Sequence, residues 1–540
     1  MKKLLYTVMA VLAMGLSSCL DDLNQDPIVE TGADGVYNSA AGCKAALGKL
    51  YVSFVIAGQE FGGGDADLST SGSESFDLMR CYINLQEAGT DEMVYTWASG
   101  DNLLDVTYLS WDASDPWVTD CYYRIYYTIA LCNDFLKHTT EDVIAGFTAT
   151  EQDDVRAYRA EARFLRALAY YYALDLFGQG PFVDENTPNV DFLPEAYNST
   201  QIFNYIENEL TAIEGTMLEP GTNEYGRADR AAAWALLARL YLNAEVYTGT
   251  GRYTDCLTYC KKIIDCNIYS LEPNYASLFN ADNHLRTNEI IFPFVVDATT
   301  TVSWGATTYL CAGAVSNDNS VQDPAAYGLT SGWGSYRVRG EFSELWGDVD
   351  TSTDSRCMLF TNSGTIDPWL NNGVEDATTG YLSEKWTNLT DAGEAASSTQ
   401  SNGVSTDFPV FRLADVYLMI AESVLRGGTG YTRADALGFL NQLRNRAYNN
   451  DPDDPTDTEG QITDSQMNLD YIIDERGREL YLECVRRTDL IRFGRFTSDQ
   501  YLWQWKGGVL NGRGVDSRYN VYPIPANEIA VNTNLSNPNY

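Results

Sequence analysis

Amphipathic helical periodicity, present in two separate parts of the chain, constrains the fold more than any other feature. Apolar residues recur at a spacing that places them on one face of a helix, in segments 156–177, 200–216, 230–247, 253–266, 413–424, 434–447 and 469–493. Such helices bury their apolar face against a neighbour. Helix pairs of this size joined by short loops resemble tetratricopeptide packing, whose period is about 34 residues. The sequence therefore predicts a mainly α fold.

From residue 267 to residue 407 the helical pattern disappears. Gly, Thr, Ser, Asn and aromatic residues dominate this part, and the short apolar run Glu289–Val296 predicts a buried strand that is weakened by Pro293. We therefore expect a loop-rich lobe with short strands and short helices, inserted between two halves of one helical body. The predicted boundaries are a helical region 19–270, an inserted lobe 271–407 and a second helical region 408–540.

The first nineteen residues have the pattern of an export signal. Lys2 and Lys3 precede an apolar run from Leu4 to Leu16, which is too short to cross a hydrocarbon core of about 30 Å. The small residues before Cys19 fit a bacterial lipobox, in which cleavage precedes the cysteine and lipid is attached to it. The sequence predicts a signal peptide over 1–18 and a lipid on Cys19 as the membrane anchor. An ordinary secretory signal with an incidental cysteine is the alternative.

Charge and composition narrow the classes of ligand. The chain has 36 Lys and Arg against 75 Asp and Glu, a formal charge of −39, which disfavours a nucleic-acid partner and an anionic membrane surface. It has only two histidines, His138 and His284, which leaves few options for zinc binding or His-based catalysis. Aromatic residues reach 12%, so the composition favours a neutral ligand that stacks on rings. The scattered cysteines form no CxxC pair and are expected to be buried apolar side chains.

No catalytic motif accompanies this composition. The sequence has no HExxH, no GxSxG and no phosphate-binding GxxxxGK[ST]. This favours a protein that is not an enzyme. Two carboxylates suffice for glycoside hydrolysis, and the many acidic residues leave an unrecognised glycosidase as an alternative.

A set of motifs, in order along the chain, resembles the SusD/RagB family of outer-membrane lipoproteins. The resemblance covers nearly the whole mature chain and is strongest to the starch-binding members, through 226–249, 303–310, 331–333 and 501–508. The motifs are Arg159-x-Glu161-Ala162-Arg163-Phe164-Leu165-Arg166-Ala167, Gly226-Arg227-Ala228, Phe411-Arg412-Leu413-Ala414-Asp415, Asn441-x-x-Arg444-x-Arg446-Ala447, Glu475-Arg476-x-x-Glu479-Leu480, Arg487-x-Asp489-Leu490-Ile491-Arg492-Phe493 and Tyr522-Pro523-Ile524-Pro525.

The resemblance implies a fold and a role. The expected fold has about four tetratricopeptide-like helix pairs, with the loop-rich lobe supplying most of the binding site. The expected role is to capture starch or malto-oligosaccharides at the cell exterior, as a lid over a SusC-like TonB-dependent barrel in the outer membrane. A different glycan, such as a β-linked chain, or a peptide in the same role are the alternatives, and a generic tetratricopeptide adaptor is a further one.

The resemblance also places a candidate ligand site. In starch-binding members three aromatic side chains follow the curved glucan, and the matching positions are Trp97, Trp304 and Trp333. Indole faces can stack on the C–H faces of pyranose rings, and neutral hydroxyls need hydrogen-bond partners rather than counter-charges. Arg80 matches a family arginine that hydrogen-bonds the sugar, and Tyr95 stands where the relative has another Trp.

Some positions depart from the family pattern. The family's polar residue after the first Trp aligns near Gly100, so Asp101 and Asn102 are the candidates, and Glu74 is the candidate for a carboxylate that aligns with Gly72. Some relatives carry a calcium ion, and the positions matched to it are His284, Ser405 and Asp407. Only Asp407 is a carboxylate of the kind that Ca²⁺ prefers.

Other conspicuous residues have a structural interpretation. Trp234 and Trp346 fall on helix faces and are expected in the core, and Trp503 and Trp505 are expected to pack within the protein. The charged cluster from Glu475 to Arg492 could suggest catalysis, but we expect it to form ion pairs that hold helices together.

Overall fold

The computed structural model describes residues 33–60, 65–69, 76–188, 192–398 and 403–540. The predicted signal peptide, the predicted lipid site Cys19 and the candidate Glu74 lie outside these residues. Within the described residues, no helix combines the length and the apolar character needed to cross a membrane.

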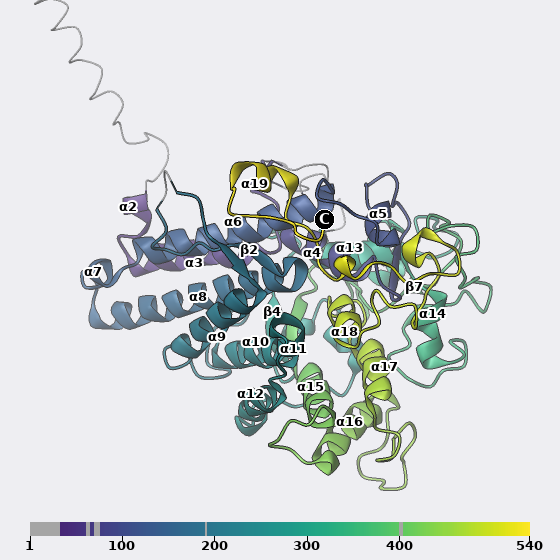
Figure 1. The fold of residues 1–540 in the computed structure, drawn as a ribbon. Coiled ribbons are helices and arrows are strands. Elements are labelled where there is room, and N and C mark those ends of the chain that lie inside the picture. Colours follow the sequence, from purple (N-terminus) through teal and green to yellow (C-terminus); the bar gives the residue numbers. More distant parts are fainter. Residues whose placement is uncertain (1–32, 61–64, 70–75, 189–191, 399–402) are drawn as a thin grey trace, which may run out of the picture.

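Helices make up most of the first half of the chain (Figure 1). Consecutive long helices pack side by side as α6 with α8, α8 with α9 and α10 with α12, which confirms the mainly α fold built from helix pairs. The helices of this half are α2 (Ala33–Val36), α3 (Ala40–Val52), α4 (Leu78–Glu87), α5 (Leu104–Tyr108), α6 (Pro116–His138), α7 (Glu141–Ile144), α8 (Ala149–Phe177), α9 (Ser199–Ile213), α10 (Arg230–Leu242), α11 (Ala244–Thr248) and α12 (Tyr253–Asp265).

Local capping sets the bounds of the longest helix, α8. Thr148 and Glu151 form a capping box at its start, and Gly178 ends it with φ of 64°, a conformation that glycine adopts without steric cost. The helix therefore begins seven residues before the predicted 156. The amphipathic stripe gave no sign of this polar first part, because a capping box needs no apolar residues.

The second half adds a helical group and several short elements. α15 packs beside α16 and against α12, so the two halves of the helical body are in contact. The elements are α13 (Ala306–Ala314), α14 (Gly340–Ser343), α15 (Leu413–Leu425), α16 (Arg433–Ala447), α17 (Leu469–Leu480), α18 (Arg486–Arg492) and α19 (Ala526–Val531), with 3₁₀ helices η3 (Tyr275–Leu278), η4 (Asn283–Leu285), η5 (Pro324–Tyr327), η6 (Glu344–Trp346), η7 (Lys506–Gly508) and η8 (Ser517–Asn520).

Two segments predicted as single helices are each interrupted. Residues 230–247 form α10 and α11, separated at Asn243, whose side chain donates to the Arg239 carbonyl at 3.0 Å. Residues 469–493 form α17 and α18, because Leu482 and Cys484 adopt left-handed φ of 57° and 61°. The buried amide of Leu482 donates to the Glu92 carboxylate, so a contact from far along the sequence stabilises this turn.

The described residues contain four small antiparallel sheets of two strands each. The expected strand in 289–296 is confirmed as β4, and a register shift at Pro293 accommodates the missing amide. The pairs are β1 (Met93–Tyr95) with β5 (Tyr336–Val338), β2 (Gln179–Pro181) with β3 (Ala196–Asn198), β4 (Ile290–Phe294) with β8 (Phe408–Arg412), and β6 (Leu359–Phe360) with β7 (Leu382–Ser383). The middle of the chain thus has the expected short elements, while the boundaries 271–407 stay a prediction.

The core confirms the structural interpretation of several residues. Trp234 and Trp346 are each 8% exposed and Trp503 is 1% exposed. Most of the described cysteines are buried, and all ten are free thiols. These side chains act as packing groups.

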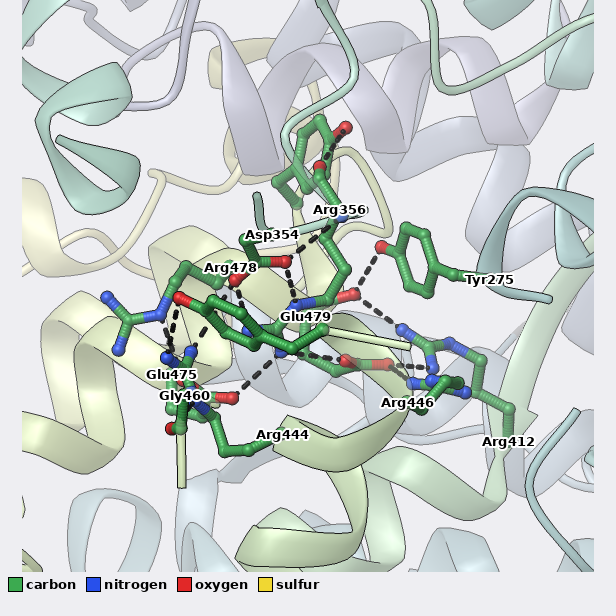
Figure 2. Close-up of polar contacts among 12 residues, drawn as sticks. Tyr275, Asp354, Arg356, Arg412, Arg444, Arg446, Gly460, Glu475, Arg478 and Glu479 are labelled. Carbon is green, nitrogen blue, oxygen red and sulfur yellow. Dashed lines mark hydrogen bonds and ion pairs between the residues drawn. The ribbon is translucent and has the colours of Figure 1, made fainter. Parts of the chain in front are cut away.

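The charged cluster of the C-terminal half is a buried ion-pair network (Figure 2). Glu475 and Glu479 on α17 are fully buried, and Arg356 donates to them at 2.8 and 3.0 Å. Burial disfavours the charged form of Glu475, but Arg356, Arg478 and Arg444 outweigh it and hold its pKa well below the ordinary range. This confirms that the cluster joins elements of the fold.

Candidate functional site

The end of the β1–β5 pair brings two of the three candidate tryptophans together. Tyr95 in β1 pairs with Tyr336 in β5. The contact continues beyond the strands, since the Thr96 amide donates to the Ser335 carbonyl at 2.8 Å and its hydroxyl donates to the Gly334 carbonyl at 2.7 Å. Trp97 comes directly after Thr96, and Trp333 comes directly before Gly334, which is bonded to Thr96. The backbones of the two tryptophans therefore lie close together, although they are far apart in the sequence.

Trp97 lies on a turn and is 38% exposed. The Asp101 amide donates to the Trp97 carbonyl at 3.0 Å and closes the turn. A distant loop holds the same turn, because the amide and hydroxyl of Ser99 donate to the Glu375 carboxylate at 2.7 and 2.8 Å. Asn102 is exposed at φ of 55°, a left-handed conformation that asparagine tolerates better than most residues.

Arg80 connects the third tryptophan to β1. Its Nη1 donates to the Trp304 carbonyl at 2.7 Å and its Nη2 donates to the Tyr95 hydroxyl at 3.1 Å. The guanidinium lies 3.7 Å from the ring centre of Tyr309, in a cation–π contact. Arg80 is only 2% exposed, so it supports the Trp304 backbone from inside the protein.

The loop that carries Trp304 is seated on the N-terminus of α4. Asp77 caps α4 by accepting from the Arg80 amide at 2.8 Å, and it also accepts from the Ser303 hydroxyl. A Cβ added to Gly305 would lie 1.9 Å from an Asp77 carboxylate oxygen, so only glycine fits this close approach. Trp304, between Ser303 and Gly305, is 36% exposed.

Tyr95 has a supporting position that the sequence did not predict. It is fully buried, so its ring offers no face to a sugar, and the expectation of a direct ligand contact is corrected for this side chain. It meets the Trp97 ring edge-on at 6.3 Å between ring centres, and its hydroxyl donates to the Asp101 carboxylate. Burial raises the pKa of Tyr95 above its usual value, which keeps the hydroxyl protonated as a donor.

Trp333 is partly buried and held by its backbone. Its amide donates to the Ala312 carbonyl at 2.8 Å, and that of Gly334 donates to the Val315 carbonyl at 2.7 Å. Arg337 also donates to the Gly334 carbonyl, at 3.0 Å. Burial lowers the pKa of Arg337 to about 10, which leaves the guanidinium charged as a donor at neutral pH.

The arrangement can stack flat rings and hydrogen-bond hydroxyl groups. Trp97 and Trp304 are exposed, Trp333 is partly exposed, and Ser99, Asp101 and Asn102 add polar atoms beside the first ring. The three indoles lie in residues 77–102, 303–309 and 331–337. The hydrogen-bonded residues that connect them lie in the same three segments. This combination suits a neutral polyhydroxylated ligand better than a charged one.

The residues matched to calcium do not fit that ion. Both carboxylate oxygens of Asp407 already accept hydrogen bonds, one from the Tyr225 hydroxyl and one from the Val296 amide at 2.8 Å. Burial raises the pKa of Asp407 to about 6. No group of three or more His, Cys, Asp or Glu side chains among the described residues is placed to hold a metal. Ca²⁺ needs six to eight oxygen ligands, which Asp407, Ser405 and His284 do not supply.

Four residues that support the site were not predicted from the sequence, namely Asp77, Ser303, Tyr309 and Glu375. Asp77 had a signal, because an aspartate just before a helical run is a typical N-cap. Glu375 had none, because it acts through a contact 276 residues away in sequence.

Two family models and several curated relatives match this chain. Residues 294–540 match the family model described as the SusD family, and residues 82–242 match one described as starch-binding and associating with the outer membrane. The starch-binding protein SusD of Bacteroides thetaiotaomicron is 35% identical, over 98% of this chain and 97% of that protein. The SusD-like protein P25 of Formosa agariphila is 24% identical, over 95% of this chain and 94% of its own.

Solved structures share the fold. A SusD homologue from B. thetaiotaomicron has a TM-score of 0.70 at 17% identity, covering 95% of this chain and 99% of its own. Surface glycan-binding protein A from the same species, in complex with laminarihexaose, has a TM-score of 0.67 at 20% identity, covering 93% and 99%. The chain therefore belongs to the SusD family of outer-membrane-associated glycan-binding proteins, which are not enzymes.

Proposed function

We propose that this protein captures starch or malto-oligosaccharides through Trp97, Trp304 and Trp333. One observation carries the proposal: Arg80 and Tyr95 join the Trp304 loop to β1, and Thr96 joins β1 to the segment of Trp333. Three indoles from distant parts of the chain thus share one support. The starch-binding name of the relative with 35% identity agrees with this substrate class.

The binding mechanism is stacking supplemented by hydrogen bonds. A helical α-glucan presents successive pyranose faces along a curve, which suits rings carried on three separate segments. Each exposed stacking contact contributes roughly 1 kcal/mol beyond area burial. The resulting affinity is weak, as suits a protein that must release its ligand.

The proposal also includes a membrane anchor and a partner protein. Cys19 carries the lipid that anchors the chain to the outer membrane, facing the cell exterior. The protein then acts as the lid of a SusC-like TonB-dependent barrel and passes the glycan to it. Co-purification of such a barrel with the full-length lipoprotein, and labelled-palmitate incorporation that is lost in Cys19→Ser, test these two statements.

Affinity electrophoresis tests the ligand and the site together. The panel contains amylopectin, the β-linked glucan laminarin and a casein digest as competitor. We expect amylopectin to retard the parent protein and the single variants W97A and W304A to lose most of the retardation, with W333A intermediate because its ring is partly buried. Phe192→Ala, which removes an aromatic ring that is 42% exposed elsewhere, is the matched control. Retardation that survives all three Trp substitutions contradicts the site, and preference for laminarin or peptide contradicts the substrate.

A further inference from the structure

A hollow lined by arginine lies at the N-terminal part of α8, where α7 and the end of α9 meet it. Its volume is about 200 Å³, and its lining includes Glu141, Arg156, Arg159, Arg163, Ile213 and Thr216. This is room for several water molecules or one small ion. Three cations around one hollow are unexpected in a chain with a formal charge of −39.

The arginines share one face of α8. Positions 156, 159 and 163 are three and four residues apart, so their side chains project to the same side of the helix. Arg163 is paired with Glu209 at 2.7 Å. Arg156 is paired with Glu141 at 2.9 Å and with Asp153 at 3.3 Å.

Arg159 differs from its two neighbours. Its Nη1 donates to the carbonyls of Leu136 and Thr139 at 2.8 and 2.6 Å, near the C-terminus of α6. Among the residues that the structure describes, no carboxylate lies within ion-pair distance of it. Burial lowers the pKa of Arg159, the carboxylates of Glu185 and Glu141 offset this only in part, and the charges of Arg163 and Arg166 add to the lowering. The guanidinium is therefore incompletely compensated, and only its Nη1 is used in the hydrogen bonds just described.

The carboxylate of Glu141 shows that the hollow can hold an oxyanion. Its carboxylate receives hydrogen bonds from Nε and Nη2 of Arg156. The Glu141 side chain is 66% exposed, and an exposed ion pair of this kind contributes little to stability. A stronger oxyanion can therefore displace it at small cost.

We propose that this hollow is a binding site for a single phosphate or sulfate group, held by Arg156 and Arg159, with Glu141 as the displaceable competitor. Guanidinium groups bind such oxyanions through paired, charge-assisted hydrogen bonds. The Arg163 side chain adds positive potential although Glu209 occupies its donors. The group can belong to a free ion, to a sugar ester or to a lipid headgroup, and these sources share the same chemistry.

Thermal unfolding and titration calorimetry of the whole mature protein test the site with inorganic phosphate. The reference is chloride at equal ionic strength, because a ligand that binds only the folded state raises the unfolding temperature in a saturable manner. We expect R159Q and R156Q to raise the phosphate dissociation constant at least tenfold. E141Q, which removes the competitor, should lower it several-fold. R433Q, an arginine on α16 whose side chain is 43% exposed and paired with Asp464, is the matched control and should leave it unchanged.

R156Q and E141Q keep the proposal falsifiable if R159Q fails to fold, because the side chains of Arg156 and Glu141 are 38% and 66% exposed. Glucose 6-sulfate in calorimetry and phosphatidylglycerol vesicles in a flotation assay identify the source of the group, since only the true source should lose binding in R156Q. A chloride effect equal to that of phosphate overturns the proposal. So does an R156Q variant that binds as the parent does, or an E141Q variant that binds more weakly.

Discussion

At the scale of the residue, each exposed indole is presented by a polar group beneath or beside it. Arg80 holds the Trp304 carbonyl, Glu375 holds the turn of Trp97 through Ser99, and Asp77 accepts from Ser303 and lies against Gly305, the residues on either side of Trp304. Hydrogen bonds to backbone atoms fix the position of a ring while leaving its face open to solvent. Binding then costs less conformational entropy than it would with a mobile loop.

Glu375→Ala tests this positioning role. The substitution removes both acceptors of Ser99, so we expect the dissociation constant for malto-oligosaccharides to rise about two- to fivefold, or roughly 0.5–1 kcal/mol. The unfolding temperature should hardly change, because the contact is at the surface. Calorimetric titration measures the affinity. Glu394→Ala, an exposed loop glutamate with the same charge change, is the control, and equal affinities of the two variants would refute the role of Glu375.

At the scale of the element, α17 connects the loop-rich middle of the chain to β8 and α16. Its Glu479 accepts from Arg412 at 2.6 Å and from Arg356 at 3.0 Å, and it also accepts from Arg446 on α16. Two residues after this helix ends, Glu92 accepts from the Leu482 amide. Side chains of one helix thus determine the relative placement of several segments that are distant in sequence.

Glu479→Gln should strongly destabilise the protein. It leaves buried guanidinium groups without their counter-charge, which costs about 3–5 kcal/mol when one partner of a buried pair is removed. Asp470→Asn on the same helix removes a carboxylate whose side chain is 86% exposed and should cost at most about 1 kcal/mol. Urea unfolding followed by circular dichroism measures both. Similar losses of unfolding free energy in the two variants would show that the buried network contributes no more to stability than an exposed ion pair.

At the scale of the whole molecule, contacts between the two ends of the chain make it one unit. Arg486 pairs with Asp91 at 2.6 Å across 395 positions, and the Trp111 indole donates to the Tyr540 hydroxyl at 2.8 Å. Figure 1 shows the corresponding proximity, with the C-terminus lying near α4 and α6. Neither helical region is therefore expected to fold with full stability alone.

Buried acids of two kinds should give stability a maximum at about pH 4–5, with a decline on either side. Burial opposes the charge of Asp415, but Arg239 and Arg476 outweigh it and hold the pKa well below the ordinary range. Its contribution is therefore present above its unfolded pKa of about 4 and is lost as the pH falls below that value. Burial raises the pKa of Glu92 to about 7. The cost of ionising it in the folded state grows as the pH rises from about 4 and is complete above pH 7.

Glu92→Gln separates the loss of stability at high pH from the loss at low pH. Above pH 7 the variant should be more stable than the parent by about 1–3 kcal/mol, provided that the amide oxygen still accepts from Leu482. Near pH 4 the difference should vanish, because Glu92 is then protonated in both the folded and the unfolded state. Urea unfolding from pH 3 to pH 8 measures the curve, and a difference between the two proteins that is independent of pH would contradict the assignment.

The sequence by itself determined the helices, the loop-rich middle and the structural nature of the charged cluster. These follow from periodicity, composition and charge pairing along α8, α15 and α17, which are local or nearly local properties. Only the tertiary structure decided the break at Leu482, the burial of Tyr95 and Arg80, and the role of Glu375. Each of these depends on a partner that lies far along the chain or on the packing around the side chain, and no local pattern encodes such a contact. The three tryptophans were named from the resemblance, but their common support is a property of the folded chain.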